Sequence, residues 1–352
     1  MLPSRRETLA SLSSVAMTSG AFLAATSCST RPDQKSIAKV ALLSPLTGQR
    51  SQMGEAIVRA ARLSPQPELS LRVFDTKGSA DGARSAMKQV AAFQPDLIVG
   101  PVSSDEASAV TSLAPALTLS NDDSLQAAGF FVMGVTARQS TGAVLAYARK
   151  AGVKKFCLVR SGSGWSARCE AAARLSADTL GMRLLAVIDL PAGNVVEALR
   201  AASAGELPNA VLLPEGGASL IATASSLQAA GLQVLGTSGW SSADIALPEA
   251  TGAWIAAPDP QASARFSAAY TNRFGEAPGM IAGLAYDAML ACLTLARARN
   301  VSRAGLIRPE GFSGVTGMLR FTADMRAERR LAILVASSEG GRPVDGGAMA
   351  WT

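Results

Sequence analysis

The sequence predicts an α/β protein with two doubly wound parallel-sheet lobes, and three observations support this. Short apolar runs rich in β-branched residues alternate with segments of helical periodicity, as in successive β-α-β units. The apolar runs are nearly continuous, which is typical of parallel strands buried on both faces of a sheet. The pattern starts again after residue 135, and a chain of 352 residues is long enough for two domains that each bury a core.

The elements follow one another in a regular order. The expected strands are 40–43, 71–74, 97–99, 116–119, 156–159, 184–188, 210–213 and 234–235. The expected helices among them are 53–63, 81–93, 104–113, 140–151, 166–180, 194–203 and 218–230. In the last of these helices Leu220, Ala224 and Leu227 share one face, and Gly231 can end the helix. After residue 258 the pattern changes to two helices, 261–274 and 279–298, and then to short strands at 318–321 and 331–336.

The first 27 residues have the features of an export signal. Arg5 and Arg6 give a positive start, and residues 9–25 are apolar but too often broken by serine and threonine for a membrane span. This stretch ends in Ala25-Thr26-Ser27-Cys28, which resembles a lipobox, although Ala25 replaces the usual leucine. We expect a signal peptide at 1–27, an acylated Cys28 and a tether at 28–36. The alternative is a buried N-terminal helix with a core cysteine.

Composition argues against several classes of function. The chain has no histidine, the commonest general base and metal ligand. Its net charge of +6 comes from scattered basic residues and aromatics are scarce, so we expect no binding to nucleic acid. Besides Cys28 three cysteines remain, and an odd number cannot form a complete disulfide framework. Cys157 and Cys292 are expected as core thiols, and a Cys157–Cys169 bridge stays open.

Several motifs resemble those of one protein family. Val40 to Gly48, Leu97 to Pro101 and Phe312 to Gly317 are similar to segments of type I periplasmic solute-binding proteins, the leucine/isoleucine/valine-binding class. The segments that resemble the short proteobacterial lipoproteins called penicillin-binding protein activators, which share this fold, are Leu213 to Gly217, Leu235 to Thr237, Ala256 to Pro260 and Leu284 to Ala288. The resemblance covers residues 37–340 and rests on the order of the motifs along the chain.

The resemblance implies two lobes between which the chain crosses three times. The implied lobes are 37–120 with 257–312, and 136–240 with 318–352. The implied crossings are 121–135, 241–256 and 313–317. A ligand is expected in the cleft between the lobes, because α/β sheets bind ligands at the carboxyl ends of their strands.

Residues that follow predicted strands are the candidate ligand-binding residues. We expect Ser103, Ser104, Ser120 and Asn121 on one wall of the cleft and Trp165, Glu215 and Trp240 on the other. The resemblance implies that residues 102–104 hold a ligand carboxylate at a helix N-terminus and that Trp165 stacks on the ligand. The acid that pairs with a ligand ammonium in amino-acid-binding relatives is absent from 236–240, and Glu215 could replace it. The alternatives are that Ser104 caps a helix and that Glu215 is a solvated loop residue.

Two short motifs resemble those of enzymes. Gly162 to Ala167 matches G-x-G-x-x-A between a strand and a helix, with Asp189 at the end of the next strand, as in dinucleotide-binding proteins. Its turn is longer than usual, and Asp189 lies farther away than in that motif. Ser85 to Lys88 matches the S-x-x-K of penicillin-binding enzymes, but no Lys-Thr-Gly follows. We therefore expect no enzyme activity and no cofactor.

Together these features predict an exported lipoprotein in the periplasm, held at a bacterial membrane by acylated Cys28. It is expected to bind a small polar ligand, either amino-acid-like or a cell-wall fragment. Its expected partners are that ligand, the lipid bilayer and either an ABC permease or a penicillin-binding protein. The alternative is a penicillin-binding protein activator, an interaction module that regulates peptidoglycan synthesis, and the absent acid near Gly236 favours it. A third hypothesis, a dehydrogenase-like enzyme, is supported by the glycine motif alone.

Overall fold

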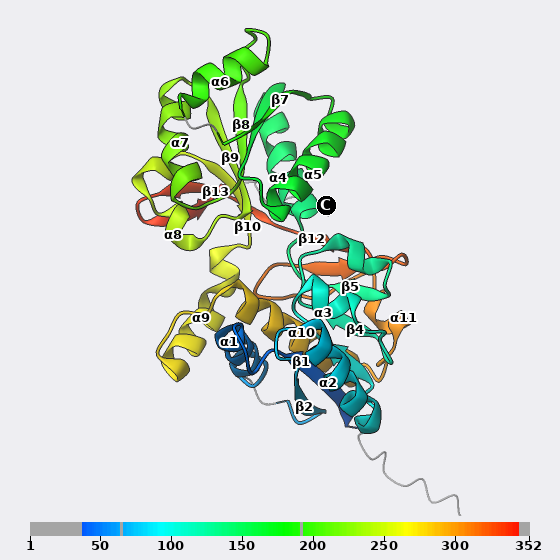
Figure 1. Cartoon of the computed structure of the whole chain (residues 1–352). Coiled ribbons are helices and arrows are strands. Elements are labelled where there is room, and N and C mark those ends of the chain that lie inside the picture. The colour runs from blue at the N-terminus through cyan, green and yellow to red at the C-terminus, as the bar shows by residue number, and fades with distance from the viewer. Residues whose placement is uncertain (1–36, 64–65, 191–192, 345–352) are drawn as a thin grey trace, which may run out of the picture. The chain divides into compact units, whose positions relative to one another are not determined.

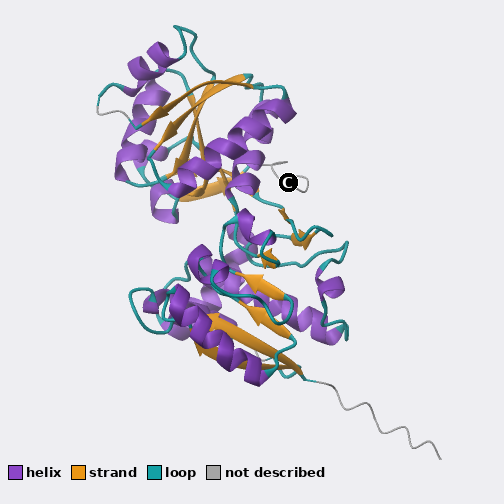
Figure 2. Ribbon diagram, turned by 45° about the vertical axis from the view of Figure 1, so that its right-hand side comes forward, coloured by secondary structure: helices purple, strands orange, loops and turns teal. Residues whose placement is uncertain are grey.

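The computed structural model describes residues 37–63, 66–190 and 193–344, and each of its two large sheets forms the centre of one α/β lobe (Figure 1). Helices flank each sheet (Figure 2). The predicted α/β class with parallel-sheet lobes is confirmed. The predicted signal peptide 1–27, the acylation site Cys28 and the tether 28–36 lie outside the described residues.

The first lobe is built on five parallel strands in the order β2-β1-β3-β4-β5. These strands are β1 (Ala38–Ser44), β2 (Leu69–Asp75), β3 (Leu97–Val99), β4 (Ala116–Thr118) and β5 (Phe130–Val132). Its helices are α1 (Ser51–Ala61), α2 (Ala80–Phe93), α3 (Ser104–Ser108), α9 (Pro260–Phe274), α10 (Met280–Arg297) and α11 (Arg303–Leu306). Val40 and Leu42 of β1 pack in a core with α1 and α10, whereas Ala41 and Leu43 pack in another with α2. Burial on both faces explains the continuous apolar run of β1.

Helix α10 is a core element of the first lobe. Among the described helices it is the one that is long and apolar enough to cross a membrane. Its residues Ala285, Met289 and Leu295 are nevertheless buried in the core that also contains α1 and the even-numbered residues of β1. Packing inside the lobe therefore accounts for its apolar composition.

The second lobe is built on a seven-stranded sheet in the order β14-β13-β10-β9-β8-β6-β7. These strands are β6 (Lys155–Arg160), β7 (Arg183–Asp189), β8 (Ala210–Glu215), β9 (Gln233–Gly239), β10 (Trp254–Ala257), β13 (Ala332–Ser337) and β14 (Gly340–Pro343). Its helices are α4 (Ala137–Lys150), α5 (Gly164–Leu180), α6 (Val195–Ala202), α7 (Ala218–Ala229) and α8 (Ser242–Ile245). Strands β6 to β10 run parallel, and β13 and β14 add an antiparallel hairpin at one edge. Val211 and Leu213 face one core, and Ala210 and Leu212 face the other.

Short elements differ most from the sequence prediction. The helix expected at 104–113 ends at Ser108. Strands β5 and β10, which lie inside segments expected as inter-lobe crossings, pair within the first and second sheets respectively. A two-stranded sheet of β11 (Leu319–Phe321) and β12 (Ala327–Arg329) packs its apolar residues in the core of the first lobe. Strands of three or four residues are too short to produce a recognisable periodicity.

The chain passes between the two lobes three times. The passages lie between β5 and α4, between β10 and α9, and between β12 and β13, as the strand pairing and the composition of the cores indicate. These passages replace the implied crossings 121–135, 241–256 and 313–317. Each implied crossing includes, or lies next to, a strand that belongs to one lobe. In particular, residues 319–329 pack in the first lobe, whereas the resemblance assigned 318–352 to the second.

A buried polar network lies beside two of these passages. Asp287 of α10 accepts hydrogen bonds from the backbone N–H groups of Val315 (2.6 Å) and Thr316 (2.9 Å) and from the Thr316 hydroxyl. The fully buried Arg329 donates to the Thr316 hydroxyl (2.6 Å) and carbonyl (3.1 Å) and to the carbonyl of Met133. Burial raises the pKa of Asp287 and lowers that of Arg329 to about 10, and the attraction between the two charges opposes both shifts. This network fixes the chain where β5 and β12 lead into the second lobe.

Candidate ligand-binding cavity

A cavity of about 430 Å³ is lined by residues of both lobes. Its volume lies in the range of small-molecule sites. The first lobe, with the passage after β5, contributes Met53, Val102, Leu119, Ser120, Asn121, Val135, Met280, Ile281 and Leu284. The second lobe contributes Trp165, Glu215, Ser238 and Gly239. Four of the seven predicted ligand-binding residues, Ser120, Asn121, Trp165 and Glu215, therefore lie around one cavity.

Ser120 and Asn121 follow β4 and form the polar part of the first wall. The Ser120 hydroxyl lies 3.3 Å from the Ser104 hydroxyl and accepts from the N–H of Asp122 (3.2 Å). The passage after β5 approaches this loop closely at Gly134, where a Cβ would lie 2.2 Å from the Ser120 carbonyl oxygen. A glycine is needed there, because any side chain would displace the loop that holds Ser120.

Ser103 has a different task from the predicted one. Its hydroxyl and backbone N–H both donate to the Glu106 carboxylate, at 2.7 and 3.0 Å, and its hydroxyl oxygen accepts from the Glu106 N–H. This is a capping box, and a second hydroxyl, that of Thr76, binds the other oxygen of the buried Glu106. Ser103 does not line the cavity. Ser104 does not line the cavity either, but its hydroxyl contacts the hydroxyl of Ser120, which does.

Trp165 stands at the start of α5 and is held by its indole N–H. This group donates to the Pro214 carbonyl (2.9 Å) and to the Thr237 hydroxyl (3.2 Å), so the ring is tied to the ends of β8 and β9. At Gly239 a Cβ would lie 2.5 Å from the indole nitrogen. The glycine thus leaves the space in which the indole reaches those two acceptors.

Glu215 ends β8 and is the one charged residue among those that line the cavity. Its Oε1 accepts hydrogen bonds from the hydroxyls of Ser161 and Ser163, the latter at 2.6 Å. Ser163 also caps α5, since its hydroxyl oxygen accepts from the N–H of Ser166 (3.0 Å). Glu215 is half-buried and fixed by two hydroxyls, so its position is determined by the protein and it is not a freely solvated loop residue.

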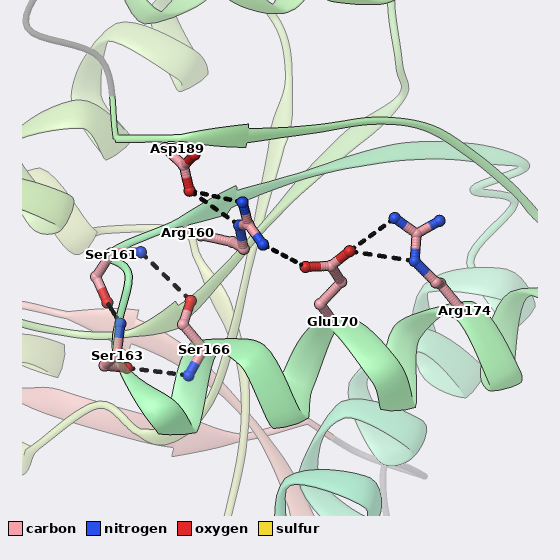
Figure 3. Close-up of polar contacts among 7 residues, drawn as sticks. All are labelled: Arg160, Ser161, Ser163, Ser166, Glu170, Arg174 and Asp189. Atoms are coloured by element: carbon pink, nitrogen blue, oxygen red, sulfur yellow. Dashed lines mark hydrogen bonds and ion pairs between the residues drawn. The ribbon is translucent and has the colours of Figure 1, made fainter.

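The glycine motif at 162–167 forms the turn that carries these serines (Figure 3). Arg160, just before it, pairs with Asp189 (2.9 Å) and with Glu170 (2.9 Å), and Glu170 also binds Arg174. The hydrogen bond from Arg174 is the main cause that lowers the pKa of Glu170. Because Asp189 is paired with Arg160, the carboxylate that a dinucleotide site would use is already engaged. The turn therefore acts as a support for Glu215.

Trp240 was predicted on the same wall as Trp165 and Glu215, but it does not line this cavity. Its side chain is 4% exposed, packs in a core of the second lobe and donates its indole N–H to the Leu213 carbonyl (2.8 Å). After β9 the chain turns so that the Trp240 N–H binds the Thr237 carbonyl (3.1 Å), and this turn directs the indole back onto the sheet. Trp240 lines a second cavity of about 380 Å³, which shares Ser238 and Met280 with the first.

A cation lies next to the cavity without lining it. Arg168 of α5 donates to the Asn121 side-chain oxygen (3.3 Å) and lies 5.7 Å from the centre of the Trp165 ring. Burial acts to raise the pKa of Asp122, but hydrogen bonds from Ser124 and Ser104 and the charge of Arg168 outweigh it, so the net shift is downward. Burial raises the pKa of neighbouring Asp123 despite the charge of Arg138.

Sequence reasoning missed several lining residues. Ser238 lies at the carboxyl end of β9, so the same strand-end rule could have found it, and Met53 lies in the first turn of α1, the helix that follows β1. Met280, Ile281 and Leu284 come from the first turns of α10, far along the chain from the other lining residues. No local signal marks them, because only the fold brings α10 to this place.

The described residues offer no alternative chemistry based on metals or disulfides. They contain no group of three or more His, Cys, Asp or Glu side chains placed to hold a metal ion. Cys157, Cys169 and Cys292 are all buried free thiols, so the open Cys157–Cys169 bridge is absent. Burial raises the pKa of Cys169 to about 11 and that of Cys292 to about 12, which leaves both thiols unreactive at neutral pH.

Comparisons with solved structures show the same fold at low sequence identity. An ABC transporter protein from Rhodospirillum rubrum, assigned to branched-chain amino acids, is 21% identical with a TM-score of 0.77, over 87% of this chain and 99% of that one. An ABC transporter substrate-binding protein from Sphaerobacter thermophilus is 20% identical with a TM-score of 0.69, over 88% and 97%. The LivJ protein from Streptococcus pneumoniae, a branched-chain amino acid transporter substrate binding protein solved with isoleucine, is 19% identical with a TM-score of 0.61, over 87% and 99%.

The sequence itself matches a protein family over nearly all of the described chain. No curated protein matches it. The sequence profile of the family described as "Periplasmic binding protein" covers residues 38–341, which includes both lobes and every residue that lines the cavity. The chain therefore belongs to the periplasmic binding protein family.

Proposed function

We propose that this chain is the solute-binding component of an ABC-type transporter and that it takes a small polar ligand into the 430 Å³ cavity. The observation that carries the proposal is the pairing, in one cavity, of a fixed carboxylate and a fixed indole from the second lobe with the Ser120–Asn121 loop of the first. Convergence of a few positioned polar groups in an otherwise apolar cavity is the usual composition of a ligand site.

The roles of the lining groups follow from their chemistry. The Trp165 ring offers a flat apolar surface to the body of the ligand. The hydroxyls of Ser120 and Ser238 and the amide of Asn121 can donate or accept hydrogen bonds, and Glu215 can accept them. Because these groups come from both lobes, a ligand that binds them all favours the conformation in which the lobes hold it together. Hinge closure of this kind is the recurrent movement of periplasmic binding proteins.

The location and partners belong to the same proposal. The family implies a periplasmic location, and the N-terminal Ala25-Thr26-Ser27-Cys28 supports lipid anchoring through Cys28. A transporter component of this kind delivers its solute to an ABC permease in the membrane, so tethering keeps it near that partner. The alternative, an interaction module that regulates a penicillin-binding protein, does not require the carboxylate and indole that the cavity retains.

A thermal-shift screen of the purified full chain tests the proposal. The screen contains amino acids, amines, aromatic acids and cell-wall peptides, and a solute that binds only the folded state raises the melting temperature. We expect Trp165→Leu to abolish the shift given by any hit, and Trp240→Leu to keep it although the protein is less stable. No shift with any solute, together with specific retention of a penicillin-binding protein on the immobilised chain, would replace this proposal by the alternative.

A further inference from the structure

The cavity carries one fixed negative charge and provides it for a ligand. Both serine hydroxyls that bind Glu215 donate to Oε1, which leaves Oε2 without a protein donor in the part of the chain that the structure describes. The Ser161 hydroxyl oxygen accepts from the Ser163 N–H (3.2 Å), and the Ser163 hydroxyl oxygen accepts from the Ser166 N–H. Each hydroxyl is therefore oriented to donate to the carboxylate. These bonds fix the side chain of Glu215.

The opposite wall offers a ligand carboxylate no positive charge, because its polar lining residues in the described part of the chain, Ser120 and Asn121, are neutral. The resemblance implies that the N–H and hydroxyl of Ser103 bind an anion, but both groups donate to the Glu106 carboxylate. Glu106 is itself buried and lies behind that wall, and α3 is a helix of only five residues with Asp105 and Glu106 in its first turn. The two acidic side chains in this first turn offset the partial positive charge that the N-terminus of α3 would offer to a ligand carboxylate.

The nearby guanidinium does not compensate for this. Arg168 donates to the Asn121 oxygen, and its charge contributes to the lowered pKa of Asp122, whose carboxylate is thus kept ionised beside it. Arg168 is not among the residues that line the cavity. Glu215 is therefore the one charged residue that lines the cavity among the described residues.

We propose that the cavity selects small solutes that carry a protonated amine on an apolar body and no carboxylate. This inference rests on the proposed solute-binding function and specifies its ligand class. The ammonium group pairs with Oε2 of Glu215, and the body contacts an apolar lining. That lining consists of Met53, Val102, Leu119, Val135, Trp165, Met280, Ile281 and Leu284. A zwitterionic amino acid has the same ammonium and body, but its carboxylate finds only neutral donors, the hydroxyls of Ser120 and Ser238 and the amide of Asn121, and no positive charge among the described residues that line the cavity.

Matched triplets of probes separate the charge classes on a constant apolar body. The first triplet is isopentylamine, 4-methylpentanoate and leucine, and the second is benzylamine, phenylacetate and phenylglycine. Binding to the full chain is measured by isothermal titration calorimetry at pH 7 and low salt. We expect each amine to bind at least tenfold more tightly than the acid and the amino acid of its triplet.

Two variants identify the group responsible. Glu215→Gln keeps the shape and the hydrogen bonds from Ser161 and Ser163 but removes the charge, and it should weaken amine binding at least tenfold. Glu197→Gln makes the same change at an exposed position of the same lobe and should leave the affinity unchanged. Unchanged amine affinity in Glu215→Gln would overturn the inference.

The two proposals fail in different ways. If an acid or an amino acid binds most tightly and Trp165→Leu abolishes that binding, the cavity is a solute site and only the charge class is wrong. If none of the six probes binds and the wider screen gives no melting shift, both proposals are overturned. If the wider screen gives hits that are all carboxylates, the solute-binding function stands and the amine class is rejected.

Discussion

Removal of Asp287 tests whether the buried network stabilises the junction between the lobes. In Asp287→Ala the N–H groups of Val315 and Thr316 and the Thr316 hydroxyl lose their acceptor, and the buried Arg329 loses the charge that compensates it. Gly314 packs directly on this carboxylate, since a Cβ there would lie 2.4 Å from the Asp287 carboxyl carbon.

The magnitude follows from the burial of both charges. Removal of one partner from a buried pair of opposite charges costs about 3–5 kcal/mol. Asp287 and Arg329 both bind the Thr316 hydroxyl, and the charge of each acts on the pKa of the other. A typical hydrogen bond to a charged group contributes about 1.5–3 kcal/mol, so three lost bonds are consistent with the upper end of that range. We expect Asp287→Ala to lower the free energy of unfolding by about 4 kcal/mol.

Urea unfolding followed by tryptophan fluorescence and by circular dichroism measures the change. Asp81→Ala serves as the matched control, because the Asp81 side chain is 91% exposed and pairs only with a surface arginine; it should change stability by less than about 0.5 kcal/mol. In the double variant Asp287→Leu/Arg329→Met both charges are gone, so it should be more stable than Asp287→Ala. A loss below about 1 kcal/mol in Asp287→Ala would refute the argument that this network holds a buried charge pair.

Four further predictions concern other parts of the molecule. Because burial raises the pKa of Asp287 above its ordinary value of 3.8, the part of the stability that comes from this shift, as distinct from the hydrogen bonds of Asp287, is full below pH 3.8 and is lost as the pH rises through the folded value. Removal of the counter-charge in Arg329→Met enlarges this loss, so the urea midpoints of variant and wild type should diverge as the pH rises from 4 to 7. Gly239→Ala should lower the free energy of unfolding by about 1–3 kcal/mol and shift the Trp165 emission, because the new Cβ displaces the indole. In the same unfolding experiment the control Gly142→Ala on α4, where a Cβ meets nothing closer than 3.7 Å, should be neutral or slightly stabilising. In the full chain carrying Cys28→Ser, a thiol reagent at pH 8 should modify none of Cys157, Cys169 and Cys292 before denaturation and all three after it; fast labelling of the native protein would contradict their burial. The same Cys28→Ser variant should move from the membrane fraction to the soluble one, and its persistence in carbonate-washed membranes would refute acylation at Cys28.

Much of the fold follows from local pattern, because burial leaves its mark on each element separately. The continuous apolar run of β1 reflects cores on both faces of the first sheet, and the periodicity of α10 reflects its packing inside the first lobe. Long helices and five- to seven-residue strands were therefore predictable. The three-residue strands β3 and β4 were also predicted, whereas β5 and β10 were expected as connecting segments, since so short an apolar run does not by itself distinguish the two.

The candidate site was predictable to the extent that parallel sheets place their strand ends together. Ser120, Asn121, Trp165 and Glu215 follow strand ends and do line one cavity. The rule failed for Trp240, where a turn after β9 directs the indole into the core, and for Ser103, whose hydrogen bonds are used within the capping box. Position after a strand indicates where the backbone of a residue lies, but the direction of its side chain depends on local hydrogen bonds.

The sequence by itself determined the α/β class, the restart of the pattern and most element positions, since each depends on interactions within a short stretch of chain. The tertiary structure alone decided which distant groups meet. Arg329 binds the carbonyl of Met133 across 196 positions, and the first turns of α10 complete a cavity whose carboxylate comes from β8. It also decided that Glu215 is held by Ser161 and Ser163, because a hydrogen bond between residues more than 50 positions apart depends on the packing of strands and turns and leaves no periodic trace in the sequence.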